Sequence, residues 1–117
     1  MAAMLDVVGS IEAARLPGGQ LVVSAHGPVD ERIVSSFVEV LVGATVDGTP
    51  VVLDLADAHG LDETALAVVQ VAAQLLVERG ARLAIVAQPL LAGRLRESSL
   101  AELVDLHASL REAVAAD

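Results

Sequence analysis

Apolar and polar residues form a pattern that changes period several times along the chain. Residues 5–16 and 20–26 are strand-like runs around the Pro-Gly-Gly of residues 17–19, a sequence suited to a turn, which predicts an antiparallel hairpin. Apolar residues then recur at helical spacing over about 31–43, and Asp30 just before them is suited to cap the helix. The pattern therefore predicts two paired strands followed by a helix.

The remaining segments alternate between short apolar runs of strand length and longer helical patterns. A turn after residue 56 is expected to separate a strand from a helix that ends at Gly80. Such alternation is typical of βαβ units with right-handed crossovers. It predicts an α/β fold in one domain over residues 1–117: a small sandwich with a mixed, mostly parallel sheet of four to five strands, preceded by the hairpin, and about four helices. Strands are predicted over 50–56, 81–87 and 102–108, and helices over 63–79, 88–99 and 109–116.

Composition narrows the class of protein. The 117 residues suit one domain, and a hydrophobic fraction of 55% supplies a core built from Ala, Val and Leu. The formal charge of −9 repels phosphate backbones and anionic lipid, which argues against nucleic acid and membrane partners and favours a basic or mixed protein surface. The most apolar stretch, residues 65–77, is shorter than the ~20 residues of a membrane span, so a soluble cytoplasmic protein is expected.

Few residues are arranged as a reaction or a metal site requires. No phosphate-binding glycine loop is present, and the absence of cysteine excludes thiolate chemistry. His26, His59 and His107 lack ligand spacing, so a metal site would have to assemble in three dimensions. Asp54 in an apolar strand is either catalytic or bonded to nearby backbone amides. The serines at 98–99 lack the context of a nucleophile. No cofactor and no metal are predicted.

The helix over 63–79 carries an unusual surface. Between residues 65 and 77 its only polar side chains are Gln70 and Gln74, which lie four apart on one face. A surface helix normally sets an apolar stripe against a charged face. Two interpretations stay open: part of the helix is an exposed apolar partner site, or alanines merely tolerate exposure because they favour helix.

The start of this helix gathers three side chains that carry oxygen. Asp62 is suited to the N-cap, and Glu63 and Thr64 would be the first two helical residues. A negative charge in the first turn is favoured by the helix dipole, typically by ~0.3–1 kcal/mol. The same position also suits a phosphoryl group. The residues alone favour capping as the full explanation.

Three stretches resemble the STAS domains of bacterial anti-sigma factor antagonists. They are GPVDERI at 27–33, the segment 51–87 with VVLDL and LDETAL, and RLRESSLAELVDLHASLREAV at 94–114. The family typically shows an acidic residue near its start, V-x-L-D-L before a turn, and D-S-S/T-G-L at the head of the second helix. The resemblance covers nearly the whole chain in the right order and implies a STAS-like fold.

The resemblance implies a protein–protein switch without substrate chemistry of its own, and so no enzyme. Antagonists of this family bind an anti-sigma factor that is also a serine kinase, which frees the sigma factor for transcription. Phosphorylation at the motif after the Asp ends the binding. By position, Asp62 matches the Asp of the motif and Asp30 matches the acidic residue near it. The implied partner-binding residues are Asp30, Asp62, Glu63, Thr64, Leu66 and Gln70.

The chain departs from the family at the phosphoacceptor motif itself. Glu63 stands where the serine usually is, Ala65 stands where glycine is usual, and Thr64 matches the second hydroxyl position. Three outcomes are open: Glu63 fixes a phosphorylated-like state, Thr64 is a displaced acceptor, or the site is a capped helix in a kinase-independent binder. A carboxylate carries about one negative charge against ≈ −1.5 to −2 for a phosphate, so its mimicry is partial.

Two other classes of protein are compatible with the sequence. The alternative is a STAS scaffold or regulatory subunit of a larger complex, such as a stress-signalling assembly or a lipid-transport ATPase. A small α/β enzyme would need convergent catalytic groups, for which Asp54 and His59 are the candidates. Self-association into a homodimer is left open by the apolar helix.

Overall fold

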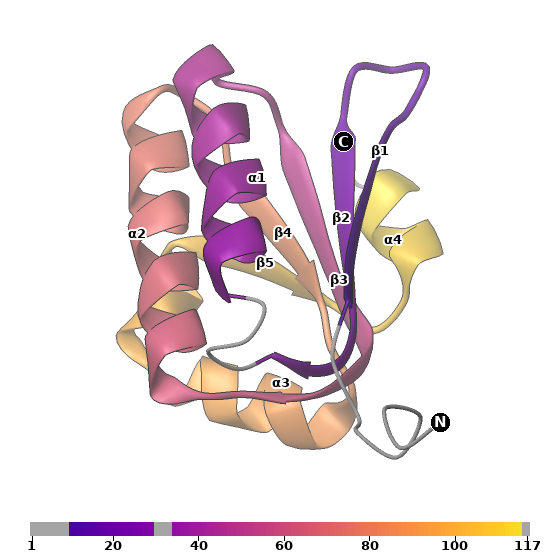
Figure 1. Ribbon diagram of the computed structural model, residues 1–117, viewed down its shortest axis with the longest axis vertical. Helices are drawn as coiled ribbons and strands as arrows, with labels where there is room; N and C mark the ends of the chain where they lie inside the picture. The colour runs from indigo at the N-terminus through magenta and orange to yellow at the C-terminus, as the bar shows by residue number, and fades with distance from the viewer. Residues whose placement is uncertain (1–9, 30–33, 116–117) are drawn as a thin grey trace, which may run out of the picture.

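A computed structural model describes residues 10–29 and 34–115, which form a five-stranded sheet with helices on both faces (Figure 1). The strands are β1 (Ser10–Arg15), β2 (Leu21–Val29), β3 (Val51–Leu61), β4 (Leu83–Val86) and β5 (Val104–His107). The helices are α1 (Val34–Asp47), α2 (Glu63–Glu78), α3 (Pro89–Arg96), the short 3₁₀ helix η2 (Ser99–Glu102) and α4 (Leu110–Ala115).

The strands lie in the sheet in the order of the sequence, β1-β2-β3-β4-β5. β1 and β2 pair in antiparallel fashion around the turn, with Arg15 opposite Leu21, and every later pair is parallel. The predicted hairpin and the mixed, mostly parallel sheet are thereby confirmed. β2 belongs to both the hairpin and the parallel part of the sheet, because it pairs with β1 along one edge and with β3 along the other.

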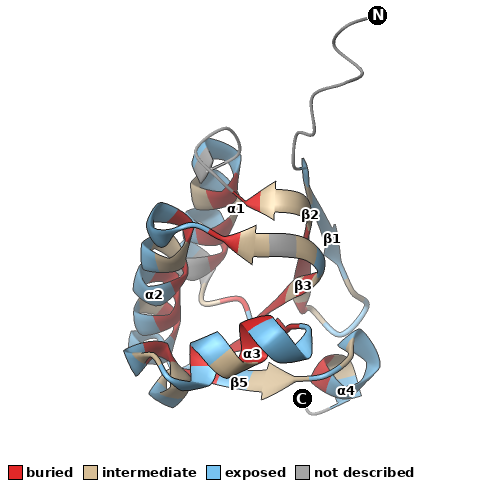
Figure 2. Ribbon diagram, turned by 90° about the horizontal axis from the view of Figure 1, so that it is seen from below, coloured by how far each residue is buried: buried red, intermediate tan, exposed pale blue. Residues whose placement is uncertain are grey.

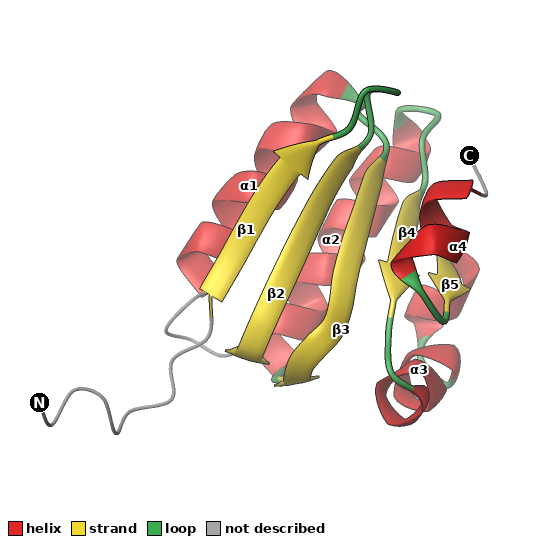
Figure 3. Cartoon of the chain, turned by 90° about the vertical axis from the view of Figure 1, so that its right-hand side faces the viewer, coloured by secondary structure: helices red, strands yellow, loops and turns green. Residues whose placement is uncertain are grey.

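The strand order fixes where the helices lie. Right-handed crossovers between successive neighbours place the connecting helices on one face of the sheet. α1, α2 and α3 accordingly share one core with that face, whereas Ala113 of α4 packs with residues of the opposite face (Figures 1 and 3). Because both crossovers run the same way, α1 and α2 are parallel neighbours, and their N-termini lie at one end of the molecule (Figure 1).

The core explains the apolar runs of the central strands. In β3, Leu53 and Leu55 point toward the connecting helices and are fully buried, and Val52, just before Leu53, packs on the other face with Ala113. Strands covered on both sides read as continuous apolar runs rather than as alternating ones. The buried positions of the helices face the sheet, and their exposed positions lie outside (Figure 2).

The prediction of a turn after residue 56 is wrong, because β3 continues to Leu61. Its second half pairs with the end of β2, from His26 opposite Asp57 to Val29 opposite Leu61, with two shifts of register. At the first shift the backbone N–H of Ala56 donates to the Asp54 carboxylate at 3.1 Å. That side chain satisfies an amide next to the irregularity, so the strand resumes beyond it.

Two helix boundaries also differ from the prediction. α1 extends beyond Gly43 to Asp47, and the expected helix over 88–99 ends at Arg96 and is followed by η2. The end of α2 at Gly80 is confirmed. Gly80 has φ +80°, and the N–H groups of Gly80 and Ala81 donate to the carbonyls of Val77 and Leu76, the pattern of a Schellman cap.

Candidate functional site

Asp62 begins α2 as its N-cap. Its backbone is extended, and its carboxylate accepts a hydrogen bond from the N–H of Ala65 at 2.8 Å, while its carbonyl accepts the first helical bond, from Leu66. The bond to Ala65 satisfies one of the N–H groups that a helix start leaves without an internal partner. The capping role predicted for Asp62 is confirmed.

The cap is also attached to the neighbouring strand. The N–H of Asp62 donates to the carbonyl of Val29, the last residue of β2, at 3.2 Å. The end of β2 therefore lies beside the first turn of α2. Asp30, the predicted partner-binding residue that follows Val29, lies outside the described residues.

The first turn of α2 divides into an exposed and a buried part. Asp62, Glu63 and Thr64 are exposed, whereas Ala65, which stands where the family usually has glycine, is fully buried. Three oxygen-bearing side chains are therefore accessible to another molecule in succession. The methyl group of Ala65 anchors the turn to the core.

The two other predicted contact residues on α2 differ in exposure. Leu66 is half-buried and packs against the core, so it offers only part of its side chain to a partner. Gln70 is exposed, and its Nε2 donates to the hydroxyl of Ser99 in η2 at 3.0 Å. Gln70 therefore connects α2 to η2 on the side of the helix away from α1.

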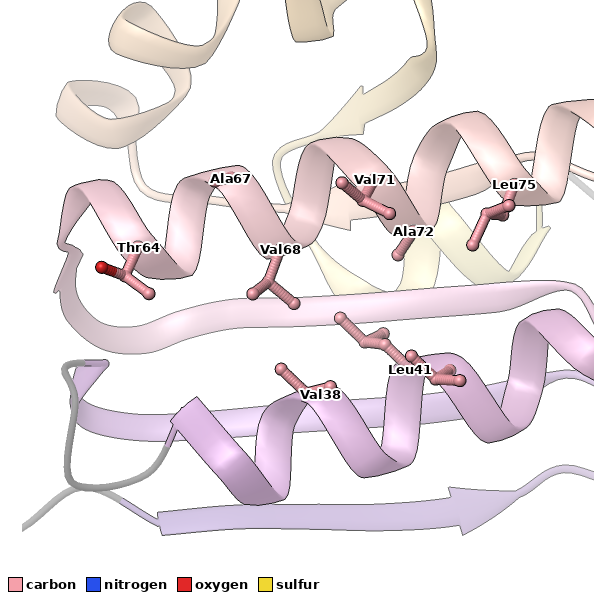
Figure 4. A pocket seen from close by; sticks show the side chains of 9 residues that line it. Val38, Leu41, Thr64, Ala67, Val68, Val71, Ala72 and Leu75 are labelled. Atoms are coloured by element: carbon pink, nitrogen blue, oxygen red, sulfur yellow. The ribbon is translucent and has the colours of Figure 1, made fainter.

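A groove runs between α1 and α2, beginning at the first turn of α2 (Figure 4). Its volume is about 280 Å³. Nine residues line it, and Thr64 supplies the only polar side chain among them; they are Val38, Leu41, Val42, Thr64, Ala67, Val68, Val71, Ala72 and Leu75. The expectation that part of α2 stays apolar and exposed is confirmed at Val71, whose exposed fraction is 57%.

The electrostatics of this end of α2 are one-sided. Asp62 and Glu63 place two carboxylates at the helix start, and within the described part of the chain neither forms an ion pair. The partial positive charge of the helix N-terminus stabilises both. The exposed turn thus presents negative charge beside an apolar groove.

The other candidate residues have structural surroundings. Asp54 accepts the backbone bond described above, which agrees with the second of its two interpretations. His26 lies on the sheet between the carboxylates of Glu12 and Asp57, at 3.6 and 3.4 Å. No group of side chains suited to a metal ion occurs among the residues described. The side chain of His59 is not among them.

The two neighbouring serines serve local structure. Ser98 caps η2: its hydroxyl accepts from the N–H of Leu100 at 3.2 Å and donates to the carbonyl of Leu95 at 2.7 Å. Ser99 accepts the bond from Gln70. Both contacts fit the expectation that neither serine is a nucleophile.

The contribution of α1 to the groove was missed by sequence reasoning. Val38 and Val42 line the groove, although the helical pattern assigned the core to other residues of this segment. The available signal was an excess of apolar positions in α1, where Val46 is also 62% exposed. An amphipathic helix with one buried stripe does not need valine at all these positions.

The chain belongs to the STAS domain family, whose model matches residues 10–113. The comparison with curated protein sequences gives no match. The assignment confirms the family resemblance seen in the sequence.

Three solved structures illustrate the similarity of the fold. An anti-sigma factor antagonist from Mycobacterium paratuberculosis has a TM-score of 0.80 at 20% identity, with 93% of each chain covered. The Bacillus cell fate determinant SpoIIAA in its phosphorylated form has a TM-score of 0.74 at 14% identity. The match covers 92% of this chain and 98% of that one. A serine-to-glutamate variant of RsbS from Moorella thermoacetica has a TM-score of 0.74 at 17% identity. The match covers 91% of this chain and 92% of that one. These likenesses establish the fold.

None of the described helices combines the length and apolar character that crossing a bilayer requires.

Proposed function

We propose that this protein is a cytoplasmic anti-sigma factor antagonist. It binds an anti-sigma factor of the serine-kinase type and so regulates transcription that depends on a sigma factor. The proposed contact residues are Asp30, Asp62, Glu63, Thr64, Leu66 and Gln70. The phosphorylation site is atypical, because glutamate occupies the position of the usual acceptor.

One observation carries the proposal: the first turn of α2 exposes Asp62, Glu63 and Thr64 at the end of an apolar groove. The resemblance of this turn to the phosphoacceptor motif of antagonists supports it as the contact region. An apolar surface beside exposed charges is what protein interfaces need, since apolar burial supplies affinity and charge supplies orientation. An active site would instead require convergent polar groups within a cavity.

The charge of the protein supports a basic surface on the partner. The net charge is −9, and two of the carboxylates, those of Asp62 and Glu63, lie at the proposed contact itself. Charges of opposite sign across an interface raise the association rate and fix the orientation of the complex. Binding is accordingly expected to weaken as the salt concentration rises.

Titration of the full chain against each anti-sigma factor kinase of its host tests the proposal. We expect saturable binding to one of them, measured by isothermal calorimetry. Asp62→Asn should weaken this binding, and Arg111→Gln serves as the control, because Arg111 is exposed on α4, on the opposite face of the sheet. Absence of binding to every kinase would overturn the proposal.

The scaffold alternative predicts a different partner in the same host. A pull-down that recovers an ATPase subunit or other STAS proteins, and no anti-sigma factor, would favour a subunit of a larger complex. The two functions are distinguished by the identity of the recovered proteins, which mass spectrometry determines.

A further inference from the structure

We propose that the groove between α1 and α2 receives one amphipathic helix of the partner protein, docked antiparallel to α2 with a basic C-terminal turn beside Asp62 and Glu63. The inference rests on the proposed function, since it specifies how the same partner is held. It names a segment, an orientation and a charge pattern that the partner must supply.

The groove has a floor, walls and two rims. Leu41 and Ala72 form the floor and are buried, with exposed fractions of 0% and 3%. Val38, Val68 and Leu75 form the walls and are half-buried. The rims are the exposed valines Val42 on α1 and Val71 on α2. Apolar side chains inserted between the rims would contact both helices and would lose their hydration.

The spacing of the lining residues matches a helix–helix seam. On α2 the lining includes Thr64, Val68, Val71 and Leu75, at intervals of four, three and four residues. Alternating intervals of three and four are those at which helices interlock side chains as knobs into holes. Because α1 lies beside α2 and runs parallel to it, the two helices offer the seam that a third helix would complete (Figure 4).

The size of the groove fits a segment better than a whole domain. From Thr64 to Leu75 it extends about 16 Å at the helical rise of ~1.5 Å per residue, which is about three helical turns. Standard interfaces use roughly 20–30 residues a side, whereas nine residues line this groove. With one hydroxyl in its lining, the groove offers few polar contacts to a small molecule, which normally needs several to fix its orientation.

Charge decides between a second copy and a basic partner. A second copy would bring another chain of charge −9 against this one. A basic helix end beside Asp62 and Glu63 is attracted instead. Positive side chains are most stable in the C-terminal turn of a helix. The negative C-terminal end of an antiparallel partner helix would also lie beside the positive N-terminal ends of α1 and α2. An antiparallel helix satisfies all three preferences at once.

A model peptide tests the groove without knowledge of the partner. The probe is an amidated alanine- and glutamine-based peptide of about four turns, with leucines at the spacing of Thr64, Val68, Val71 and Leu75 and lysines in its last turn. One control peptide has the same composition with its leucines distributed around the helix. A second carries glutamate in place of lysine. Methyl NMR spectra of the full chain follow the titration.

We expect the probe to shift the methyl signals of the groove valines and Leu75, and the two control peptides to bind at least about tenfold more weakly. Val71→Gln should weaken the probe by a similar factor. Val77→Gln is the matched control, because Val77 is an exposed valine of the same helix that does not line the groove. Equal binding by both variants, or shifts confined to other methyl groups, would overturn the proposal.

The natural partner gives an independent arm. If a host kinase binds the unmodified protein but Val71→Gln leaves its affinity unchanged, the groove proposal fails and the proposed function stands. If no kinase binds but the probe passes its controls, the proposed function fails and the groove remains a helix site. A dimer that sedimentation detects in the unmodified protein and not in Val71→Gln would identify a second copy as the occupant and overturn the basic-helix proposal.

Discussion

Glu63 and Thr64 are adjacent at the start of α2, but only Thr64 lines the groove shared with α1. Successive residues of an α-helix are separated by about 100° around its axis, so the two side chains leave the helix in different directions. A charge at position 63 therefore stays exposed outside the groove, and a charge at position 64 enters the mouth of an apolar groove. The two positions are not equivalent sites for a negative switch.

Thr64→Glu should weaken docking in the groove without unfolding the protein. The new carboxylate would have to lose hydration against apolar side chains whenever a partner docks. In the free protein it remains exposed in the first helical turn, where the helix dipole offsets repulsion from Asp62 and Glu63, so the free energy of unfolding should change by no more than about 1 kcal/mol. Urea denaturation and peptide titration measure the two effects separately.

Thr64→Val is the matched control for that experiment. It keeps the branched shape of the side chain and removes the hydroxyl, so it should retain docking and lose any phosphorylation at position 64. Equal losses of docking in both variants would indicate that the hydroxyl itself makes the contact, contrary to the apolar groove.

Glu63→Ser should restore a phosphoacceptor at the usual position of the family. Treatment with the partner kinase and ATP is expected to place phosphate on the new serine, because it is exposed and follows the capping Asp62. In the unmodified protein Thr64 is the only acceptor of the motif. Mass spectrometry assigns the positions, and phosphate found solely at Ser35, Ser36 or Ser98 would contradict the assignment of the site.

Asp62 should matter for stability and for binding in separable ways. Asp62→Ala removes the acceptor for the N–H of Ala65 and should lower the free energy of unfolding by about 1 kcal/mol, within a range of roughly 0.5–2. Asp62→Asn keeps an oxygen at that position, so its stability should stay within about 0.5 kcal/mol of the original. Thermal denaturation followed by circular dichroism, together with kinase titration, tests this difference. Equal stability of both variants would show that the hydrogen bond is replaced by water.

Local patterns were sufficient to predict most of the fold. The hairpin, the buried strands and the cap at Asp62 depend on neighbouring residues, and turn chemistry and apolar periodicity report on such contacts directly. The end of α2 at Gly80 was predictable for the same reason, because a left-handed cap selects glycine.

The continuation of β3 through residues 57–60 was not predictable from local sequence. Asp57 and Gly60 are typical of turns, and isolated from the sheet they would favour one. Pairing with the end of β2 overrides that preference, since Gly27 opposite Ala58 and Val29 opposite Leu61 supply partners for the backbone. A tertiary contact decided the local structure.

The groove was predictable only in part. The sparse polar residues of α2 indicated an exposed apolar surface, but the other wall belongs to α1, which precedes α2 by a whole strand. Which valines of α1 face α2 depends on the rotation of one helix against the other. That rotation is set by packing on the sheet rather than by the sequence of either helix.

Two glycines should respond to alanine with opposite signs. Gly43 lies inside α1, has no positive φ, and a Cβ there would meet no atom within 4 Å, so Gly43→Ala should raise the free energy of unfolding by about 0.5–1 kcal/mol. Gly80 also has open space but a φ of +80°, so Gly80→Ala should lower the same quantity by about 1–2 kcal/mol. Urea denaturation of the two variants measures both changes. Because space is open at both positions, a loss of stability in Gly43→Ala would mean that α1 does not continue through residue 43, and the α1 wall of the groove would then have to be placed differently.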